Sequence, residues 1–360
     1  MESIVTTEDF IIREKSQMAD SLAIKYRPHT WDDITEQGEV VDILTNQLKS
    51  NEIKHGYLFT GPAGCGKTTA ARIFANEING GKGQPIELDA ASNNSVDDIR
   101  KLIEDAQTQA IDSEYKVFIV DECHMITPQG WNAFLKTLEE PPARAIFIMA
   151  TTNPEKIPAT ILSRVQRYNF QKISTQGIIN RLVYILQNEY PGKTGPNDIG
   201  ITVDRDAIEY IAKIAEGGMR DAITLMDKCL SFNTELTVEN VTKALGVADY
   251  SVMQHLTNVL ALSDRAEIIN TVQEVYNSGA DLKLFIKQYF EFVLNLSIYN
   301  ISHDMSLTTL PTNISDIKYD YSFLIRLVDY ICQLNSALKY DQNPRVLILA
   351  KLLTFVEDRV

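Results

Sequence analysis

Residues 61–69, Gly-Pro-Ala-Gly-Cys-Gly-Lys-Thr-Thr, combine the residue types that hold a phosphate group. Glycines let the backbone curl until successive N–H groups face an anion, and a helix that starts there adds its positive dipole end. Lys67 is long enough to reach the β- and γ-phosphates of a nucleotide, and the Thr68 hydroxyl is a hard oxygen ligand for the accompanying Mg²⁺. The alternative is a chance glycine turn between a strand and a helix. The predicted nucleotide-binding residues are Gly61, Pro62, Ala63, Gly64, Cys65, Gly66, Lys67, Thr68 and Thr69.

Two carboxylates, Asp121 and Glu122, follow the apolar run Val117–Val120. Four consecutive apolar residues predict a fully buried parallel strand, and ligands bind where such strands end. We expect Asp121 to hold Mg²⁺, directly or through water, and Glu122 to orient and partly deprotonate an attacking water. The alternative, a pair of solvated turn carboxylates, is common for Asp-Glu pairs that no phosphate loop precedes. His124 follows closely and is interpreted as a structural histidine rather than a catalytic one.

A third polar group ends the next apolar run, Ala145–Ala150. Because neighbouring parallel strands end at the same edge of a sheet, a side chain there lies beside Asp121. It is then within reach of the γ-phosphate or of the attacking water. Thr152 and Asn153 both qualify for this position.

Short apolar runs alternate with helical patterns between residues 57 and 170, which predicts an α/β domain with a five-stranded parallel sheet. From Ser174 onward only helical patterns occur, and the segment Leu282–Ile298 is apolar on most faces, which favours burial against other helices or a neighbouring subunit. The predicted domains are an extension at 1–20, an α/β domain at 21–172, a small helical domain at 173–247 and a second helical domain at 248–360.

Composition limits the possible functions of this chain of 360 residues. Its formal net charge of −14 disfavours binding to DNA by bulk electrostatics, so any DNA contact must be local or made within an assembly. No apolar stretch approaches the roughly 20 residues that cross a bilayer, and residues 1–20 lack the apolar centre of a secretory signal. The four cysteines lie far apart, as in a reduced protein. We expect a cytoplasmic protein without a membrane partner.

Seven segments in register over residues 22–245 carry a family resemblance. They are Leu-Ala-Ile-Lys-Tyr-Arg-Pro at 22–28, the phosphate loop, Asp-Ala-Ala-Ser at 89–92, Val-Asp-Glu-Cys-His-Met at 120–125, Leu-Lys-Thr-Leu-Glu-Glu-Pro-Pro at 135–142, Ala-Thr-Thr-Asn-Pro at 150–154 and Ile-Leu-Ser-Arg at 161–164. The chain thereby resembles the AAA+ ATPase subunits of sliding-clamp loaders, and in particular the gamma/tau subunits of bacterial DNA polymerase III. In the last third of the chain the similarity is limited to an all-helical oligomerisation collar. Residues 173–247 correspond to the lid of the family.

The resemblance assigns roles to single residues. Lys67 and Thr68 resemble the Walker A pair, and Asp121 and Glu122 the Walker B pair. Thr152 falls where the family has its first sensor.

Two arginines and one tripeptide also have counterparts in the family. Arg220 is similar to the second sensor, which contacts the γ-phosphate from the lid. Arg164 resembles the arginine finger that serves the ATP of the adjacent subunit, and a cation supplied across an interface makes hydrolysis depend on assembly. The segment Tyr26-Arg27-Pro28 resembles one that lines the adenine pocket. The alternative for each arginine is an ordinary surface or ion-pair residue.

Two departures from the family pattern are present. The gamma/tau subunits carry a four-cysteine zinc module after the first helix, whereas Asn79–Gln84 bridges that point directly, so no zinc is expected. The family's Ser-Arg-Cys is Ser163-Arg164-Val165 here, which keeps the arginine. A compact, zinc-free form of this kind suits a bacteriophage or another mobile replicon.

The resemblance implies an ATP-hydrolysing motor subunit of a clamp loader. With other loader subunits it would form an open, pentameric ring around a primer–template junction. ATP binding would hold an opened sliding clamp, and hydrolysis would release the clamp onto DNA. Local DNA contacts are predicted at Ser92, Asn93, Asn94, Ser95, Arg100 and Lys136.

Two alternatives of other classes stay open. The first is a non-catalytic structural subunit that supplies Arg164 to a neighbour; the presence of both Walker pairs argues against it. The second is another AAA+ DNA-remodelling ATPase, such as a branch-migration motor or a replication initiator. Such proteins usually end in a winged-helix domain with strands and a basic face, whereas residues 250–360 are predicted to be helical and not basic.

Overall fold

The structure of the chain is a computed structural model that describes residues 21–191, 201–246, 250–304, 307–308, 310, 319–339, 341 and 343–357. These residues form two compact units: one lies within Met1–Gly200 and Ile208–Asp227, and the other within Ile201–Ala207 and Lys228–Val360. The predicted extension at 1–20 lies outside the described residues. The domain boundaries predicted after residues 172 and 247 stay predictions.

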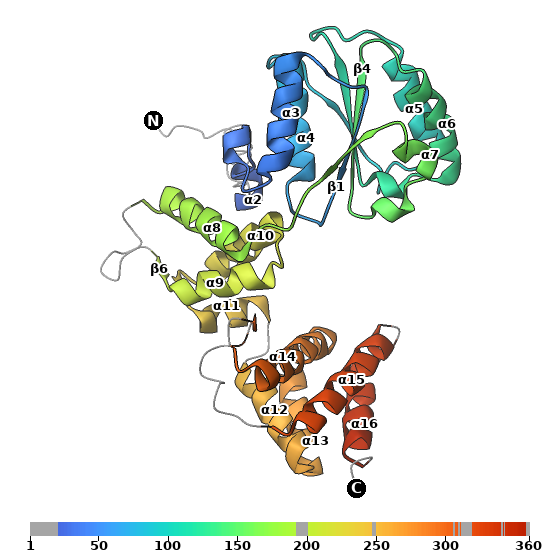
Figure 1. Cartoon of the computed structure of the whole chain (residues 1–360). Coiled ribbons are helices and arrows are strands. Elements are labelled where there is room, and N and C mark those ends of the chain that lie inside the picture. The colour runs from blue at the N-terminus through green and yellow to red at the C-terminus, as the bar shows by residue number, and fades with distance from the viewer. Residues whose placement is uncertain are drawn as a thin grey trace, which may run out of the picture. The chain divides into compact units, whose positions relative to one another are not determined.

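A parallel sheet of five strands forms the centre of the first unit, with strand order β2-β3-β4-β1-β5 (Figure 1). The strands are β1 (Gly56–Thr60), β2 (Ile86–Asp89), β3 (Lys116–Asp121), β4 (Ala145–Thr151) and β5 (Gln166–Asn169). The register pairs Thr60 with Thr151 and Asp89 with Asp121, so the carboxyl ends of neighbouring strands meet at one edge. The sequence prediction of a five-stranded parallel sheet is confirmed.

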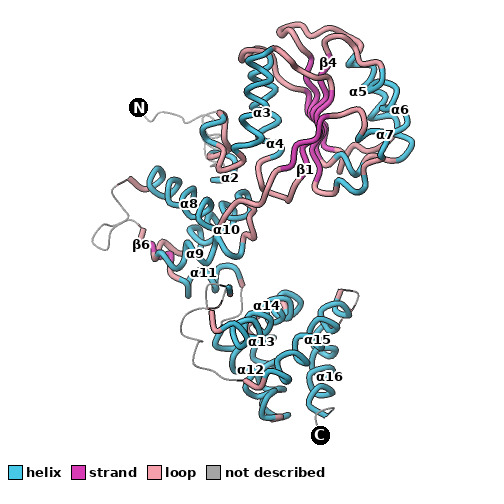
Figure 2. The backbone as a smooth tube through the Cα atoms, viewed as in Figure 1, coloured by secondary structure: helices cyan, strands magenta, loops and turns pink. Residues whose placement is uncertain are grey.

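Helices cover both faces of this sheet (Figure 2). Side chains of β1 alternate between the two faces: Phe59 belongs to the core under α3 (Gly38–Ser50) and α4 (Lys67–Ile78), and Leu58 to the opposite core. The opposite core lies under α5 (Val96–Ala106), α6 (Pro128–Glu139) and α7 (Ala159–Leu162). Because both of their faces are buried, β3 and β4 are almost continuously apolar, whereas the edge strands β2 and β5 carry more polar residues.

Capping residues set where the helices of this unit begin. Ser95 and Asp98 form a capping box at the start of α5. Helix α6 begins at Pro128, because the Thr127 side chain accepts a hydrogen bond from the Gly130 N–H. The remaining short helices of the α/β part are α2 (Leu22–Lys25), η1 (Trp31–Asp33), η2 (Cys123–Met125) and η3 (Pro154–Lys156).

The region predicted as the lid contains α8 (Thr175–Glu189), α9 (Arg205–Ile214), α10 (Met219–Phe232) and α11 (Val238–Leu245). The expectation that this region is helical only is wrong in one detail. Strands β6 (Thr202–Val203) and β7 (Glu235–Leu236) form a two-stranded parallel sheet. Two residues are too few to produce a periodic pattern, so sequence periodicity could not reveal this pair.

Five helices form the C-terminal bundle: α12 (Tyr250–Leu262), α13 (Arg265–Asn277), α14 (Leu282–Ser302), α15 (Tyr321–Leu338) and α16 (Pro344–Glu357). Apolar side chains from all five share one core. The Tyr289 hydroxyl is fully buried there and lies 3.0 Å from Thr257 Oγ1, which also donates to the Met253 carbonyl at 2.8 Å. In the described part of the chain, no helix is long and apolar enough to cross a membrane.

The Thr257–Tyr289 pair gives a stability prediction for the second unit. We expect Thr257→Val to lower its free energy of unfolding by about 1–3 kcal/mol, because the Tyr289 hydroxyl would be buried without a partner. Tyr289→Phe should cost about 1 kcal/mol, because Thr257 keeps its bond to Met253. The double variant should be more stable than Thr257→Val alone.

Urea unfolding followed by circular dichroism measures these differences. Both tryptophans, Trp31 and Trp131, lie in the first unit, so the transition seen by tryptophan fluorescence is an internal control and should not shift. A Thr257→Val variant as stable as the wild type would contradict the prediction.

Candidate active site

A cavity of about 310 Å³ opens beside the phosphate loop, in the first unit. It brings together the groups that the sequence singled out far apart in the chain: loop residues 63–69, the Walker-type carboxylates and the Tyr26-Arg27-Pro28 segment. Arg220 of α10 and Arg181 of α8 also line it. The structure thus gathers most of the predicted nucleotide-site residues around one space. Arg181 was missed, because a lone arginine in a helical pattern carries no signal.

The phosphate loop has the backbone that its glycines allow. Gly61, Gly64 and Gly66 have φ angles of +147°, +69° and +103°, which residues with a Cβ rarely adopt. At Gly61 space is lacking as well, since an added Cβ would lie 2.3 Å from the Phe170 carbonyl oxygen. The chain directly after β5 therefore packs against the loop backbone at this point.

Lys67 is buried and has its ammonium group satisfied by the loop itself. Its Nζ donates to the carbonyl oxygens of Gly61 at 2.9 Å and Pro62 at 2.6 Å. A buried cation needs hydrogen-bond acceptors, and these carbonyls supply them. To reach a phosphate, as the sequence predicts, Lys67 must exchange them for phosphate oxygens. The neighbouring Cys65 is also buried, which raises the pKa of its thiol and argues against a reactive role.

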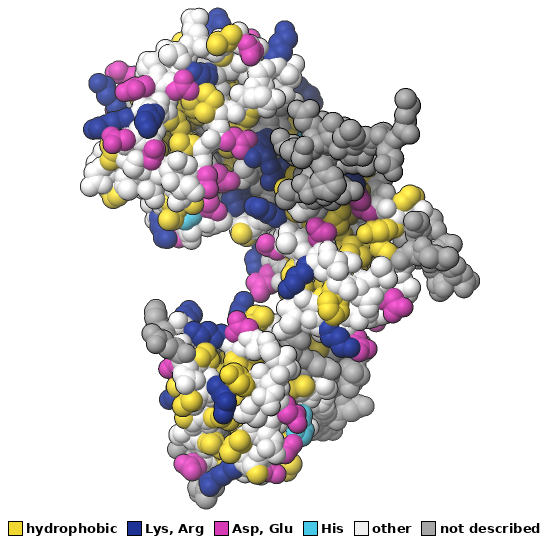
Figure 3. Space-filling view, turned by 180° about the vertical axis from the view of Figure 1, so that it is seen from behind, with side chains coloured by type: hydrophobic (Ala, Val, Ile, Leu, Met, Phe, Trp, Pro, Cys, Tyr) yellow, Lys and Arg dark blue, Asp and Glu magenta, His cyan; other side chains and the backbone are white. Residues whose placement is uncertain are grey.

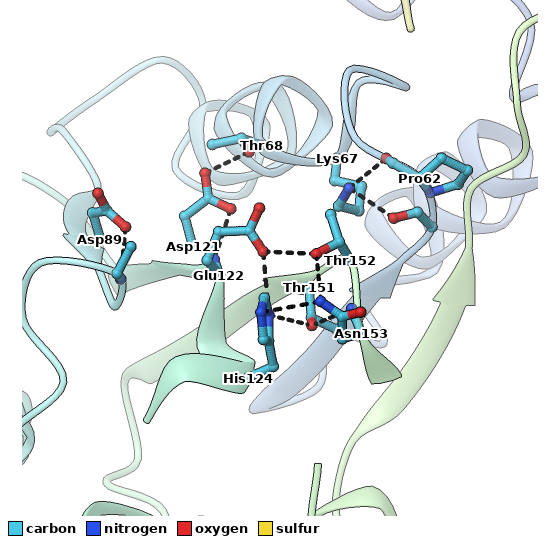
Figure 4. Close-up of polar contacts among 12 residues, drawn as sticks. Pro62, Lys67, Thr68, Asp89, Asp121, Glu122, His124, Thr151, Thr152 and Asn153 are labelled. Carbon is cyan, nitrogen blue, oxygen red and sulfur yellow. Dashed lines mark hydrogen bonds and ion pairs between the residues drawn. The ribbon is translucent and has the colours of Figure 1, made fainter. Parts of the chain in front are cut away.

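Thr68 and Asp121 lie together as expected for a magnesium site. The Thr68 hydroxyl donates to Asp121 Oδ2 at 2.7 Å, and Asp121 Oδ1 accepts from the Glu122 N–H at 2.9 Å (Figure 4). Hydroxyl and carboxylate oxygens are hard ligands of the kind that Mg²⁺ prefers. The two residues therefore fit the predicted ion. The expectation that the chain binds no zinc stays a prediction.

Glu122 has an unusual backbone and a restrained side chain. Its φ of +45° and ψ of +42° are left-handed, a conformation that costs a residue with a side chain about 1 kcal/mol. One carboxylate oxygen, Oε2, lies 3.2 Å from Thr152 Oγ1 and 3.2 Å from His124 Nδ1. Strained backbone of this kind occurs at functional sites, where the surrounding structure holds it in place.

Three further side chains complete this polar network. His124 Nδ1 also lies 3.0 Å from Thr151 Oγ1, and Asn153 Nδ2 lies 3.1 Å from both His124 Nε2 and Thr152 Oγ1 (Figure 4). Sequence analysis proposed Thr152 and Asn153 as alternatives, whereas the structure brings both into one network with Glu122. The interpretation of His124 as hydrogen-bonded and structural missed its direct contact with Glu122.

The lid helices contact the loop and the N-terminal segment. The Met219 N–H, in the first turn of α10, donates to the Gly64 carbonyl at 3.0 Å. Tyr26 donates to Glu189 of α8 at 2.5 Å, and Lys25 pairs with the same carboxylate at 2.6 Å. Burial and the Glu189 contact raise the pKa of Tyr26 to about 12, so it stays a neutral hydrogen-bond donor. Arg220, next to Met219, is exposed and lines the cavity.

Arg164 does not line this cavity. It follows α7 and pairs with Glu139 of α6 at 2.5 Å, and it also donates to the Thr160 carbonyl at 2.6 Å. Its guanidinium therefore faces a different surface of the domain. This position agrees with the alternative that Arg164 is an ordinary ion-pair residue. It also agrees with the arginine-finger role, because a residue that serves a neighbouring subunit must lie outside the cavity of its own chain.

The residues predicted to contact DNA lie on the α5–α6 side of the sheet. Ser92 and Asn93 bond to Asp89, at 3.4 and 3.2 Å, and Ser95 caps α5. Arg100 pairs with Asp97 within α5, and Lys136 is exposed in the second half of α6. The loop at 92–95 and these two helices thus share one layer. Their contact with DNA stays a prediction.

The close approach at Gly61 gives a testable prediction. We expect Gly61→Ala to lower the melting temperature by several degrees and to prevent ATP binding, because the new methyl group would collide with the Phe170 carbonyl. Gly80→Ala is the matched control: its φ is also positive, at +57°, but an added Cβ meets nothing within 4 Å. This control should cost about 1 kcal/mol and leave ATP binding unchanged. Thermal unfolding and calorimetric ATP titration measure both effects, and equal behaviour of the two variants would contradict the prediction.

Three protein-family models match successive parts of the chain. The model of the DNA polymerase III delta subunit matches residues 36–94 and 86–174. The ATPase lid domain of the DNA polymerase III clamp loader subunit matches residues 196–234. Domain III of DNA polymerase III subunits gamma and tau matches residues 236–317. These matches overlap the parts predicted from the sequence as the α/β domain, the lid and the collar, and the predicted bounds themselves stay predictions.

Curated relatives match over most of the chain. DNA polymerase III subunit tau of Bacillus subtilis is 32% identical over 354 residues, covering 89% of this chain and 60% of that protein. The gamma/tau subunit of Mycoplasma genitalium is 31% identical over 333 residues, covering 85% and 54%. That of Mycobacterium tuberculosis is 34% identical over 292 residues, covering 74% and 49%. The chain spans about half to three-fifths of the length of these relatives.

A solved structure with a similar fold is the RuvB Holliday junction branch migration motor of Thermotoga maritima. It is 18% identical and has a TM-score of 0.49, covering 65% of this chain and 79% of that one, a likeness too distant to support a function. The matching family models instead all describe subunits of one assembly, and they follow one another along the sequence in the order of its parts. The chain therefore belongs to the family of gamma/tau-like clamp-loader subunits of DNA polymerase III.

Proposed function

We propose that the chain is an ATP-hydrolysing motor subunit of a sliding-clamp loader. The observation that carries this proposal is the single cavity in which the phosphate loop, Asp121, Glu122 and the lid arginine Arg220 meet. A structural subunit that only supports its neighbours would not need all of these groups in one place. The named relatives support the assignment to DNA polymerase III.

The proposed mechanism assigns each residue a separate task. The loop N–H groups and Lys67 bind the phosphates, while Thr68 and Asp121 hold Mg²⁺. The ion supplies charge neutralisation at the phosphate oxygens. Glu122 accepts the proton of the attacking water, and Thr152 restrains its carboxylate. Arg220 contacts the γ-phosphate from the lid, and Tyr26, Arg27 and Pro28 line the adenine side.

Arg164 is proposed to complete the active site of an adjacent subunit. Two observations support this role: Arg164 lies outside the cavity of its own chain, and its side chain keeps 31% of its surface exposed. Hydrolysis would then require correct assembly, because the charge that develops in the transition state needs the neighbour's cation. The Glu139 ion pair would have to open when the neighbour docks.

Assembly is proposed to involve the C-terminal bundle, residues 248–360, as the collar of a pentameric ring. Figure 3 shows apolar side chains gathered on one face of this bundle. Its exposed apolar residues include Leu262, Ile269, Leu294, Ile301, Ile325 and Val346. Exposed apolar patches of this kind are typical of protein interfaces. The ring would bind the clamp and primer–template DNA, and it would act in the cytoplasm. In each subunit the AAA+ domain would comprise residues 21–172 and the lid residues 173–247.

ATP hydrolysis by the full chain with its loader subunits tests the motor proposal. We expect primed DNA and the cognate clamp together to stimulate the rate severalfold, and Glu122→Gln to lower it at least about a hundredfold while ATP still binds. ATP binding without hydrolysis under every condition would indicate the structural subunit instead. Stimulation by junction DNA without any effect of the clamp would favour another AAA+ machine.

A mixing experiment tests whether Arg164 acts between subunits. Arg164→Ala should lower the rate about 10³-fold or more, as loss of an arginine finger does. Mixed with Glu122→Gln chains, it should regain part of the activity, because Glu122→Gln chains keep Arg164 and Arg164→Ala chains keep Glu122. Arg144→Ala, which removes an exposed arginine of the same domain, is the control and should be fully active. Absence of any recovery on mixing would contradict action between subunits.

A further inference from the structure

His124 lies beneath the catalytic carboxylate rather than at the surface of the domain. Its side chain keeps only 8% of its surface exposed. Its ring nitrogens contact three neighbours: Nδ1 lies 3.2 Å from Glu122 Oε2 and 3.0 Å from Thr151 Oγ1, and Nε2 lies 3.1 Å from Asn153 Nδ2 (Figure 4). Each nitrogen thus faces a defined partner, so the ring has one preferred orientation.

These partners determine which nitrogen carries the proton. The Asn153 amide nitrogen can only donate, so His124 Nε2, which lies 3.1 Å from it, is the acceptor. In the neutral ring the proton then lies on Nδ1, which is 3.0 Å from Thr151 Oγ1 and 3.2 Å from Glu122 Oε2. The same amide nitrogen donates to Thr152 Oγ1 at 3.1 Å. The Thr152 hydroxyl hydrogen is therefore directed at Glu122 Oε2.

One amide consequently orients two groups that contact a single carboxylate oxygen. Oε2 of Glu122 accepts the Thr152 hydroxyl and lies 3.2 Å from His124 Nδ1, within ion-pair distance. Among the described residues no donor contacts Oε1, and Figure 4 shows it pointing away from Thr152 and His124, while Glu122 lines the cavity. The Glu122 side chain is 36% exposed, so packing alone does not hold it. The Thr152 hydrogen bond and the His124 contact at Oε2 are what restrain it.

We propose that His124, oriented by Asn153, is a positioning residue that fixes the Glu122 carboxylate with Oε1 presented to the attacking water. This inference rests on the proposed ATP hydrolysis. A general base acts only when it lies within hydrogen-bond reach of the proton that it accepts, so a freely rotating carboxylate would be in place for only part of the time. His124 contributes to the rate of the chemical step, and it does not contribute to ATP binding because it does not line the cavity.

A matched set of His124 variants tests the inference in the assembled loader with clamp and primed DNA. His124→Ala should lower kcat about tenfold, a part of what a general base contributes, with the KM for ATP changed less than about twofold. In His124→Asn the side-chain amide nitrogen takes the place of Nδ1, and it should restore kcat to within about threefold of the wild type. His124→Gln places its amide near Nε2 instead and should be as slow as His124→Ala. His55→Ala, an exposed histidine of the same domain, should have no effect.

A double-mutant cycle separates positioning from general destabilisation. In chains that already carry Glu122→Gln, His124→Ala should cause no further loss of rate, because its effect runs through Glu122. Asn153→Ala should also lower kcat, and its effect should not add to that of His124→Ala. Thermal unfolding of each variant shows whether the fold is kept, and the Asn153 variant repeats the test if His124→Ala unfolds.

Several outcomes would overturn the inference. An unchanged kcat in His124→Ala, equal rates in His124→Asn and His124→Gln, or a further loss in the Glu122→Gln background would each do so. If the wild type hydrolyses ATP and Glu122→Gln does not, any of these three outcomes contradicts only the positioning role of His124, and the proposed ATP hydrolysis stands. A wild type without stimulated hydrolysis would remove the proposed function, and this inference with it.

Discussion

Parallel hydrogen bonding among β1, β3 and β4 brings the carboxyl ends of three strands to one edge of the sheet. The acidic and polar groups that follow these strands depend on this pairing for their positions. The phosphate loop leaves β1, Asp121 and Glu122 leave β3, and Thr151 to Asn153 leave β4. A shift of one residue in the β3–β4 register would move Thr152 away from Glu122 and Asn153 away from His124. The apolar cores on both faces of the sheet make such a shift costly, because every buried side chain would change face.

Polar groups in this site satisfy one another before any substrate does. The Lys67 ammonium has two loop carbonyls, the Thr68 hydroxyl has Asp121, and one oxygen of the Glu122 carboxylate has the Thr152 hydroxyl and a contact with His124. Buried polar groups without partners would cost several kcal/mol each, so these internal partners stabilise the loop when no substrate is bound. Substrate binding then replaces one set of hydrogen bonds by another, and the net gain is smaller than the sum of the new contacts.

The sequence allowed the sheet, most helices and most of the cavity lining to be predicted, because each is encoded by a local pattern. Buried parallel strands are continuous apolar runs, and the phosphate loop has fixed residue types at fixed spacing. What could not be predicted depends on contacts between distant segments. The pairing of Arg164 with Glu139 requires the packing of α7 on α6, and the contact of His124 with Asn153 requires the register of two strands. The β6–β7 pair was too short to leave a pattern.

Helix α10 begins with two consecutive residues that have different tasks. The N–H of Met219 is bound to the carbonyl of Gly64, and no side chain separates the two backbones, because Gly218 lies against Gly64. The start of the helix is thereby held at a fixed height above the phosphate loop. Arg220, one residue further, lines the cavity. Because the Met219–Gly64 hydrogen bond joins the two segments, α10 cannot leave the phosphate loop without giving up this bond. The loop and the first turn of α10 therefore form one mechanical unit.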